Sequence, residues 1–573
     1  MPRRTLVPAA AIASAGLLLT GCVSDAGGEA VVVDTADAPP GDAIALPAAS
    51  VDDAVTGALA QLSDLIADDL AETGVPGLAV AVVHGGEIVY AEGFGVKTVG
   101  EGDPVDPETV FQIASVSKSL SATAVSAAIG QGALTWETPV SDLLPGFALS
   151  DPYVTEHATV GDFFSHRTGL DTGAGDDLED LGYGREYILD HLDMLPLDAF
   201  RSSYHYSNYG ITVGAEAAAA AVGEPWEDVT ESLVYEPLGM TRTSSRYEDF
   251  LAEDDRATIH AFVDGTFQPL FDRDPDAQAP AGGVSSNVID LAAWMNAVLA
   301  GGEHGGEQVF DAAALTAATT GEMISGHPPE ATWRTSMYGF GFNVDTTVGG
   351  RTGIAHSGGF VLGAATNFRL IPSLDLGIVT LTNGGPYGLP EAVNAQFLDL
   401  VQYGDLTRDW ITDYRAAVAS LTAPVGDLVD EQAPSAPDAP RDLADYEGIY
   451  ENAYFGPLTV SERDGRLVVA MGADDGYVLE LRHWDGDAFA FVPTGENAPE
   501  GSLSSATFVQ DAGDVTGVTL QFFDTQGLGT WSLTPCGDEP GALDPYVGEV
   551  EERLSLTHTE VGSHKVAHGV CPP

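Results

Sequence analysis

The stretch Phe111-Gln-Ile-Ala-Ser115-Val-Ser-Lys118-Ser-Leu120 reads as a short apolar strand or turn that leads into a helix continuing toward Ile129. We expect Ser115 at or near the helix start, where unpaired backbone N–H groups favour negative charge. Lys118 follows three residues later, so its side chain is expected on the same helix face, one turn on. A lysine in a desolvated cleft can lose its proton and help to activate a serine, as nucleophilic catalysis requires.

Lysine is rare in this chain, which contains only Lys97, Lys118 and Lys565, while its other basic residues apart from histidine are arginines. A lysine at position 118 therefore suggests a role that arginine cannot fill, because guanidinium does not deprotonate in proteins. The simpler alternative is a serine that caps the helix and a lysine that faces solvent one turn later, and the S-x-x-K pattern alone does not exclude it.

A second segment with reactive side chains covers residues 203–211, where an aromatic loop leads into an alanine-rich helix. Tyr206 supplies a phenol and Asn208 supplies an amide. A nearby ammonium stabilises a phenolate, so Tyr206 beside Lys118 would act as a general base. Asn208 would hold a substrate carbonyl or orient Lys118. The alternative is an aromatic loop that packs against the core.

A third segment, Thr352-Gly-Ile-Ala-His356-Ser357-Gly358-Gly359-Phe360, lies between β-prone runs. On a strand it would project a side chain over the cleft, and its glycines would let the backbone approach a ligand closely. We assign Ser357, Gly358 and Gly359 to substrate binding. The N–H of Gly359 would form an oxyanion hole with that of Ser115. The alternative is a hydrogen-bonded histidine beside a glycine turn.

These three motifs, in this order, resemble those of the penicillin-recognising serine hydrolases, which include class C β-lactamases, DD-peptidases, D-aminopeptidases and related esterases. The resemblance extends over roughly residues 51–399. It implies an α+β fold of the β-lactamase/transpeptidase type, in which an antiparallel sheet with terminal helices packs beside a helical subdomain. It also implies that Ser115 forms an acyl-enzyme, that Lys118 and Tyr206 share proton transfer, and that Asn208 holds the substrate amide.

His356 departs from the pattern of many relatives, which have lysine at this place in the third motif. That lysine normally serves as the cation for a substrate carboxylate, whereas histidine is mostly neutral near pH 7. Some relatives with esterase or D-amino-acid peptidase activity share the histidine. The resemblance therefore includes His356 among the catalytic residues and weakens the case for a dedicated β-lactamase.

The chain has 573 residues, 44% of them apolar, and its 86 acidic against 22 basic residues give a net charge of -64. This length predicts two or more domains. The charge argues against binding to nucleic acids or to anionic membrane surfaces. The run of acidic residues from Asp171 to Asp180 is expected to be a solvated loop, with a calcium site as the alternative.

The N-terminus predicts export. A basic start, a short apolar run and the ending Leu19-Thr-Gly-Cys22 resemble a lipoprotein signal peptide over residues 1–22, with Cys22 lipidated. Residues 23–50 read as a flexible linker. We expect an extracytoplasmic protein whose contact with the cell membrane is this lipid anchor. An ordinary signal peptide is the alternative.

The C-terminal part changes in pattern. Residues 51–420 are assigned to the catalytic domain, residues 421–442 to a linker, and residues 443–573 to a small antiparallel β-barrel with several short strands. The barrel's aromatic residues would line a ligand cavity or fill a core. In an oxidising compartment Cys536 and Cys571 are expected to form a disulfide. The usual zinc-binding patterns are missing, so we expect neither metal nor cofactor.

The leading hypothesis is an exported serine hydrolase that acts on an amide or ester in a small molecule or peptide: a D-amino-acid peptide, a cell-wall fragment or a small ester. β-Lactamase activity is the alternative enzyme. A penicillin- or peptide-binding sensor without turnover is the alternative of another class. The chain lacks the G-x-S-x-G motif of α/β-hydrolases. The oligomeric state stays open.

Overall fold

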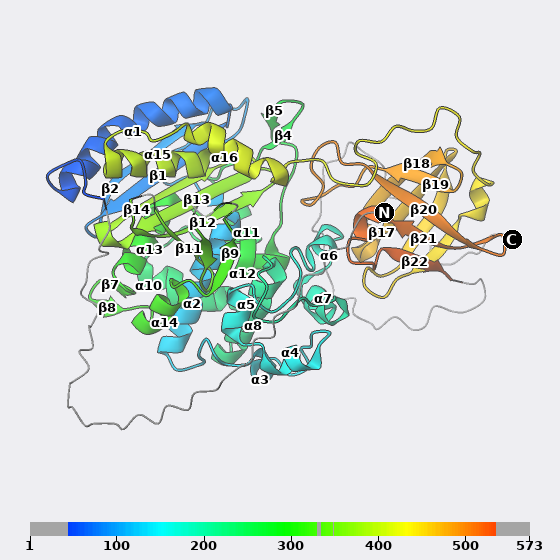
Figure 1. Cartoon of the computed structure of the whole chain (residues 1–573), viewed down its shortest axis with the longest axis horizontal. Coiled ribbons are helices and arrows are strands. Elements are labelled where there is room, and N and C mark those ends of the chain that lie inside the picture. The colour runs from blue at the N-terminus through cyan, green and yellow to red at the C-terminus, as the bar shows by residue number, and fades with distance from the viewer. Residues whose placement is uncertain (1–43, 329, 331–333, 348, 535–573) are drawn as a thin grey trace, which may run out of the picture. The chain divides into compact units, whose positions relative to one another are not determined.

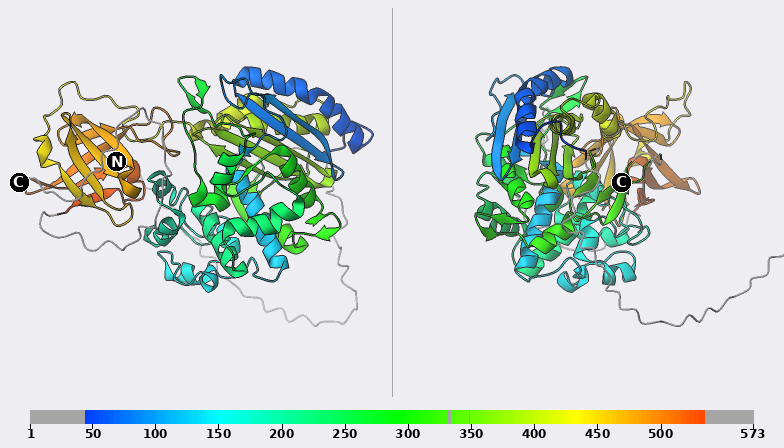
Figure 2. Two further views of the ribbon diagram at one scale, coloured as in Figure 1. Left: turned by 180° about the vertical axis from the view of Figure 1, so that it is seen from behind. Right: turned by 60° about the vertical axis from the view of Figure 1, so that its left-hand side comes forward.

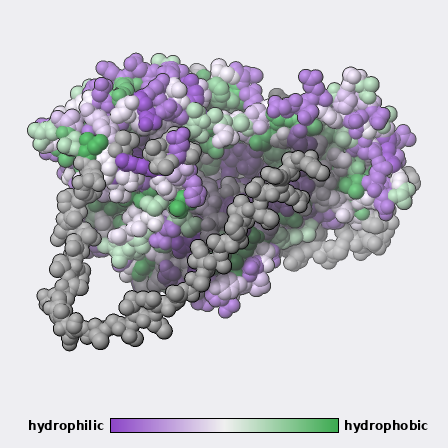
Figure 3. All heavy atoms as spheres, in the orientation of Figure 1, coloured by the Kyte–Doolittle hydropathy of each residue, from purple (hydrophilic) through white to green (hydrophobic). Residues whose placement is uncertain are grey.

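The computed structural model describes residues 44–328, 330, 334–347 and 349–534 (Figure 1). All of them fall within one compact unit. The predictions for Cys22, Cys536 and Cys571 lie outside these residues. Within the described part of the chain, no helix is both long enough and apolar enough to cross a membrane. Hydrophilic residues predominate on the face that Figure 3 shows, as the acidic composition leads one to expect.

The core of the catalytic domain is an eight-stranded antiparallel sheet in the order β2-β1-β14-β13-β12-β11-β10-β9. Gly85-Gly86 lies between two β-rich runs, a pattern that predicts a hairpin, and β1 and β2 form this hairpin. Both β1 and β14 are apolar along most of their length and buried, because helices cover the sheet on both faces. The strands are β1 (Gly77–His84), β2 (Glu87–Gly95), β9 (Met323–Gly326), β10 (Ser336–Tyr338), β11 (Asn343–Thr346), β12 (Thr352–Phe360), β13 (Ala364–Ile371) and β14 (Leu376–Thr382).

Three helices from the two ends of the catalytic domain cover one face of the sheet: α1 (Val51–Thr73), α15 (Leu389–Tyr403) and α16 (Trp410–Val418) (Figures 1 and 2). α1 begins at Ser50, whose hydroxyl accepts a hydrogen bond from the Asp53 backbone N–H. Its buried residues recur at helical spacing and pack against α15 and the sheet. The expected terminal helices are therefore confirmed.

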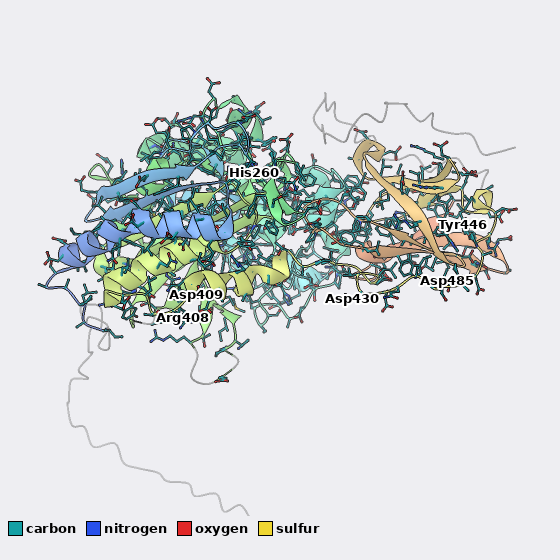
Figure 4. The ribbon with its side chains drawn as sticks, turned by 90° about the horizontal axis from the view of Figure 1, so that it is seen from above. His260, Arg408, Asp409, Asp430, Tyr446 and Asp485 are labelled. Atoms are coloured by element: carbon teal, nitrogen blue, oxygen red, sulfur yellow. The ribbon has the colours of Figure 1, made fainter. Side chains whose placement is uncertain are left out.

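The sequence of residues 404–419 predicts a helix, but in the structure the α-helix within this range, α16, begins only at Trp410. Gly404 ends α15 in the left-handed conformation at φ 77°. The chain turns, and Asp409 then caps α16 by accepting from the Thr412 backbone N–H, with Arg408 just before it (Figure 4). Residues 404–409 are exposed and mostly polar, as suits a connection between two helices.

Helices form a second layer on the other face of the sheet. The longest are α2 (Ser117–Gly130), α8 (Asn208–Val222) and α13 (Val288–Leu299), and α13 contacts β1 and β14. The shorter helices are α3 (Val140–Leu143), α4 (Pro152–His157), α5 (Val160–Phe164), α6 (Asp176–Asp180), α7 (Arg185–Asp190), α9 (Trp226–Thr230), α10 (Glu236–Leu238), α11 (Tyr247–Ala252), α12 (Ala279–Gly282) and α14 (Ala312–Ala318). Outside the main sheet, β3 (Phe111–Gln112) pairs with the distant β6 (Ser285–Ser286), and two hairpins are formed by β4 (Ala261–Val263) with β5 (Thr266–Gln268) and by β7 (Glu303–His304) with β8 (Glu307–Gln308).

The C-terminal strands form a closed antiparallel barrel, as expected. Its first strand, β15, pairs with its last, β22, and this pairing closes the barrel. Tyr446, Tyr450 and Trp531 are fully buried, so these aromatic residues fill a core (Tyr446 is labelled in Figure 4). The strands are β15 (Gly448–Glu451), β16 (Leu458–Arg463), β17 (Arg466–Met471), β18 (Tyr477–Asp485), β19 (Ala488–Phe491), β20 (Ser504–Asp511), β21 (Asp514–Leu520) and β22 (Thr530–Leu533).

The packing of α1 on the sheet is open to a direct test. Ile66 is fully buried in the core between α1 and α15. Ile66→Ala should lower the free energy of unfolding of the catalytic domain by about 2–5 kcal/mol, because it removes buried methyl groups and leaves a cavity. Asp64→Ala, an exposed site on the same helix, should change it by less than about 0.5 kcal/mol. Equal effects in urea denaturation would contradict this packing.

Candidate active site

The segment that carries Ser115 is a tight connection from β3 into α2. Ala114 adopts φ 46°, a left-handed conformation that costs a non-glycine residue about 1–3 kcal/mol. Neighbouring hydrogen bonds hold it there: the Ile113 N–H donates to the Val284 carbonyl, and the Ser117 hydroxyl donates to the Ala114 carbonyl. The strained turn leaves the Ser115 side chain partly exposed, just before the first turn of α2.

The Lys118 side chain is fully buried and its Nζ has three oxygen neighbours. These are Oδ1 of Asn208 at 2.7 Å, the carbonyl oxygen of Ala281 at 2.9 Å and Oγ of Ser115 at 2.9 Å. The amide and carbonyl oxygens can only accept, so they take two protons of the amine. In the neutral amine the remaining lone pair then faces the Ser115 hydroxyl, and the lysine is placed to accept its proton.

Burial makes the neutral amine accessible near physiological pH. Desolvation lowers the pKa of Lys118 to about 7, opposed by the carboxylates of Asp176 and Glu179. A surface lysine would be almost fully protonated at the same pH. The solvent-facing alternative for Lys118 is therefore wrong: the residue lies inside the site and contacts the predicted nucleophile.

Tyr206 lies beside this pair. Its phenol is hydrogen-bonded to Ser115, and its ring centroid is 4.6 Å from Nζ of Lys118. Burial raises the pKa of Tyr206 above its usual range, although the Ser115 hydrogen bond opposes the shift. The resting phenol is thus neutral, and this differs from the phenolate expected from the sequence. A neutral phenol can still pass a proton between Ser115 and a leaving group.

The loop that presents Tyr206 is held by a buried histidine. Nδ1 of His166 accepts from the Ser207 backbone N–H at 3.2 Å, and its carbonyl accepts from the His205 N–H at 3.1 Å. The rings of His166 and Tyr206 lie 4.6 Å apart. Ser207 then caps α8 through the Gly210 N–H. Tyr206 is therefore fixed from both sides of the loop.

Asn208 opens α8 and connects Lys118 to an acidic residue that sequence reasoning missed. Its Oδ1 accepts from Lys118, and its Nδ2 donates to Oδ2 of Asp176 at 3.2 Å. The carboxylate fixes the amide orientation, because only the NH₂ group can donate to it. Burial and the nearby Glu179 raise the pKa of Asp176 to about 7.

The acidic run from Asp171 to Asp180 is therefore not a solvated loop. Asp176 contacts Asn208, Glu179 accepts from Arg273 at 2.8 Å, and Asp180 accepts from backbone N–H groups of the barrel loop. The run forms α6 and the approach to it, and it packs against the site. In so acidic a chain, nothing in the local sequence distinguishes this run from a surface loop.

His356 lies near the site without contacting Ser115. Nδ1 is 2.6 Å from the Ser357 carbonyl and must donate to it, so Nε2 accepts from the Tyr338 hydroxyl at 2.8 Å. Burial, with the positive charge of Lys118, lowers the pKa of His356 to about 3, so the ring is neutral. Its centroid is 6.3 Å from that of Tyr206. This geometry supports packing behind Tyr206 more than direct proton transfer.

The Ser357 side chain points away from Ser115, which corrects its assignment to substrate binding. Its hydroxyl accepts from Nδ2 of Asn367 at 3.0 Å and contacts Glu391, on the face of β12 that α15 covers. Successive side chains of a strand alternate between faces. Because His356 and Gly358 point toward the nucleophile, Ser357 cannot.

The two glycines of this motif lie where predicted. A Cβ on Gly358 would lie 2.9 Å from the Ser115 nitrogen and would overlap the Ile113 carbonyl, so only glycine lets β12 approach the nucleophile. Gly359 lines the same cavity as Ser115, Tyr206 and Asn208, with a volume of about 390 Å³. Within the described part of the chain, no cluster of His, Cys, Asp and Glu suited to a metal ion is present.

Comparison with known proteins agrees with this geometry. The family model described as Beta-lactamase matches residues 62–403, and a model for a domain of unknown function (DUF3471) matches residues 432–530. The chain is 27% identical to the unguisins hydrolase ungD of Aspergillus violaceofuscus, over 69% of this chain and 75% of that protein. It is 28% identical to penicillin-binding protein 4 of Amycolatopsis lactamdurans, over 66% of this chain and 93% of that protein. It is 30% identical to esterase EstB of Burkholderia gladioli, over 38% and 57%.

Solved structures show the same fold. The octameric penicillin-binding protein homologue from Pyrococcus abyssi matches with a TM-score of 0.54 at 20% identity, over 81% of this chain and 98% of that chain. SurE matches with a TM-score of 0.51 at 22% identity, over 84% of this chain and 100% of that chain. These structural matches confirm the α+β fold expected from the sequence, and the family model and the sequence relatives confirm the serine hydrolase superfamily.

The protonation of Lys118 predicts a pH dependence. The amine must be neutral to accept the serine proton, so the rate at which a fluorophosphonate labels Ser115 should rise with pH around a midpoint near 7. Asp176→Asn removes a charge that raises the pKa of Lys118, so the midpoint should fall by roughly half a unit or more. Asp64→Asn, on the exposed face of α1, is the matched control. An unchanged or higher midpoint in Asp176→Asn would contradict this coupling.

The close approach of β12 predicts opposite outcomes at neighbouring positions. Gly358→Ala should slow fluorophosphonate labelling by roughly 10²-fold, because its methyl group displaces β12 from Ser115. Ser357→Ala, on the opposite face of the same strand, should label at close to the wild-type rate. Thermal melting would verify that both variants are folded. If only Ser357→Ala lost labelling, the Ser357 side chain would have to face Ser115, which would contradict the orientation of β12.

Proposed function

This chain belongs to the beta-lactamase family of serine hydrolases, and from that premise we propose that it forms an acyl-enzyme through Ser115 and hydrolyses an amide or ester. The observation that carries the proposal is the set of contacts around Lys118. Two obligate acceptors hold the amine so that its lone pair faces the Ser115 hydroxyl at 2.9 Å. Because Asn208 and Ala281 already bind the amine, its contact with Ser115 is better explained by proton transfer than by structural support.

In the acylation step, neutral Lys118 accepts the proton of the Ser115 hydroxyl as Oγ attacks the substrate carbonyl carbon. The carbonyl oxygen becomes an oxyanion, which the backbone N–H groups of Ser115 and Gly359 stabilise. When the bond to the leaving group breaks, Tyr206 donates its proton to the leaving nitrogen or oxygen. Lys118 returns a proton to Tyr206, and the acyl group stays on Ser115.

In the deacylation step, a water molecule attacks the acyl carbon and gives up a proton to the same lysine–tyrosine pair. The bond to Oγ breaks, Ser115 regains its proton, and the carboxylic acid product leaves. The neutral phenol of Tyr206 suits this role, because it can donate its own proton to one group and take another from Lys118. Asn208 keeps Lys118 in place and offers its amide to the substrate.

The site supports a D-amino-acid peptide, a cell-wall fragment or a small ester better than a β-lactam. Neither a lysine nor an arginine is among the described residues that line the Ser115 cavity, and His356 is neutral. A substrate carboxylate therefore lacks the cation that it would need. β-Lactamase activity stays the alternative, because the same nucleophile and base would open a lactam ring.

We also propose that the protein is exported and anchored by lipid at Cys22. The support is the sequence of residues 1–22, which combines a basic start, an apolar run and a cysteine in a lipoprotein-like ending. A substrate from the cell wall would be available to an enzyme held outside the membrane.

Mass spectrometry of the intact protein tests the acyl-enzyme. Wild-type protein mixed with a short-chain ester, a D-Ala peptide with an amidated C-terminus or a cephalosporin should gain the acyl mass and lose it as product accumulates, whereas Ser115→Ala should gain none. Turnover should be greatest with the ester or peptide. A stable adduct without product release would favour a sensor instead, and an adduct that persists in Ser115→Ala would refute the assignment of the nucleophile.

A further inference from the structure

A second cavity, of about 460 Å³, adjoins the one that contains Ser115. The two cavities share five lining residues: Thr172, Gly173, Asp176, Val425 and Asn497. The second cavity is also lined by four aromatic side chains of the barrel: Tyr454, Phe455, Phe522 and Phe523. A ligand segment bound at Ser115 can therefore extend into an apolar space beyond it.

The barrel loop that contributes Asn497 to both cavities is hydrogen-bonded to α6. The carboxylate of Asp180 accepts from the backbone N–H groups of Glu496 at 3.0 Å and Asn497 at 2.9 Å. Gly495 lies against the same carboxylate at φ 115°, and a side chain there would overlap it. Glu496 in turn accepts from the N–H of Val361, just after β12. The loop is thus part of the wall of the active site.

The lining of both cavities is acidic and, among the described residues, contains no lysine, arginine or histidine. Most of its carboxylates have donors. Arg273 forms an ion pair with Glu179 and lies 4.0 Å from Glu496. The hydroxyl groups of Ser504 and Ser505 donate hydrogen bonds to Asp427. The carboxylates that line the two cavities are those of Asp176, Asp177, Glu179, Asp427 and Glu496.

Asp177 differs from these carboxylates. Among the described residues, neither a hydrogen-bond donor nor a basic group pairs with its side chain, and its charged neighbours are Asp180 and Asp176. Burial and these two neighbours raise the pKa of Asp177 to about 7. The charged form of a partly buried carboxylate beside two others is unfavourable, and among the described residues no cation of the protein offsets it.

We propose that the second cavity is a substrate subsite for a segment that carries an ammonium group on an apolar or aromatic frame, with Asp177 as its counter-ion. The inference rests on the proposed function and specifies its substrate class. Aromatic walls beside a carboxylate suit an organic cation, which gains from ring faces as well as from the charge. A divalent metal would need several oxygen ligands in one shell, and the described residues do not offer such a cluster.

The same charge pattern selects against acidic substrates. A carboxylate near the scissile bond would meet Asp176 and Asp177 without a cation between them, and like charges at close range are repulsive. The subsite therefore favours peptides or amides with a free amino group or a basic side chain near the bond that is cleaved. It disfavours penicillins, whose carboxylate would face this lining.

Calorimetric titration with matched probes tests the subsite without requiring the true substrate. Phenylalaninamide carries the ammonium and the ring, and N-acetylphenylalaninamide keeps the ring without the charge. Each is used in both enantiomers. One enantiomer of the cation should bind the wild-type protein at least about tenfold more tightly than its acetylated form. Asp177→Asn should reduce this ratio to below about threefold.

Asp193→Asn, an exposed acidic site that lines neither cavity, should keep the wild-type ratio. Equal binding of the two probes, no binding of the cation, or an unchanged ratio in Asp177→Asn would each overturn the subsite. Calcium binding that depends on Asp177, without binding of phenylalaninamide, would also overturn it. The ratio in the wild-type protein decides the question even if a variant fails to fold.

Fluorophosphonate labelling of the same samples separates the two proposals. If Ser115 is labelled and esters are hydrolysed while phenylalaninamide and its acetylated form bind equally tightly, the subsite proposal fails and the hydrolase proposal stands. If Ser115 is not labelled, the hydrolase proposal itself fails.

Discussion

The burial of one amine between a serine hydroxyl and two fixed oxygen acceptors is the constraint on which this site depends. Lys118 has no exposed surface, and its neighbours come from three separate segments of the chain. Charged lysine is costly in such a place, so its pKa falls to about 7 and the free amine becomes available. Any displacement of these segments would either let water reach the amine or remove one of its acceptors.

The scaffold meets this constraint with rigid elements. α2 carries Lys118, α8 presents Asn208, and α12 supplies the Ala281 carbonyl. β12 approaches from the sheet, where its glycines allow backbone contact with the nucleophile. Strain in the turn at Ala114 is tolerated because hydrogen bonds on both sides hold it. The site is therefore built from the starts of two helices, a short third helix and a central strand.

The barrel adds specificity to this chemistry. Its loop at Glu496 is bonded to α6 and to the end of β12, so the wall of the active site includes residues from both domains. The same α6 provides the carboxylate that orients Asn208. The second cavity and the proton-transfer site at Ser115 therefore both include residues of α6. A ligand that changes the charge on α6 would change the pKa of Lys118.

The sequence by itself determined the local elements and the chemical groups. The hairpin at Gly85-Gly86, the helix after Ser115, the short C-terminal strands and the three ordered motifs follow from turn chemistry, apolar spacing and residue type, which act over a few residues. Only the tertiary structure decided that Ser357 faces away from the nucleophile, that Tyr206 stays neutral and that Asp176 reaches Asn208. Those outcomes depend on burial and on contacts between segments far apart in the chain, and local sequence patterns contain neither.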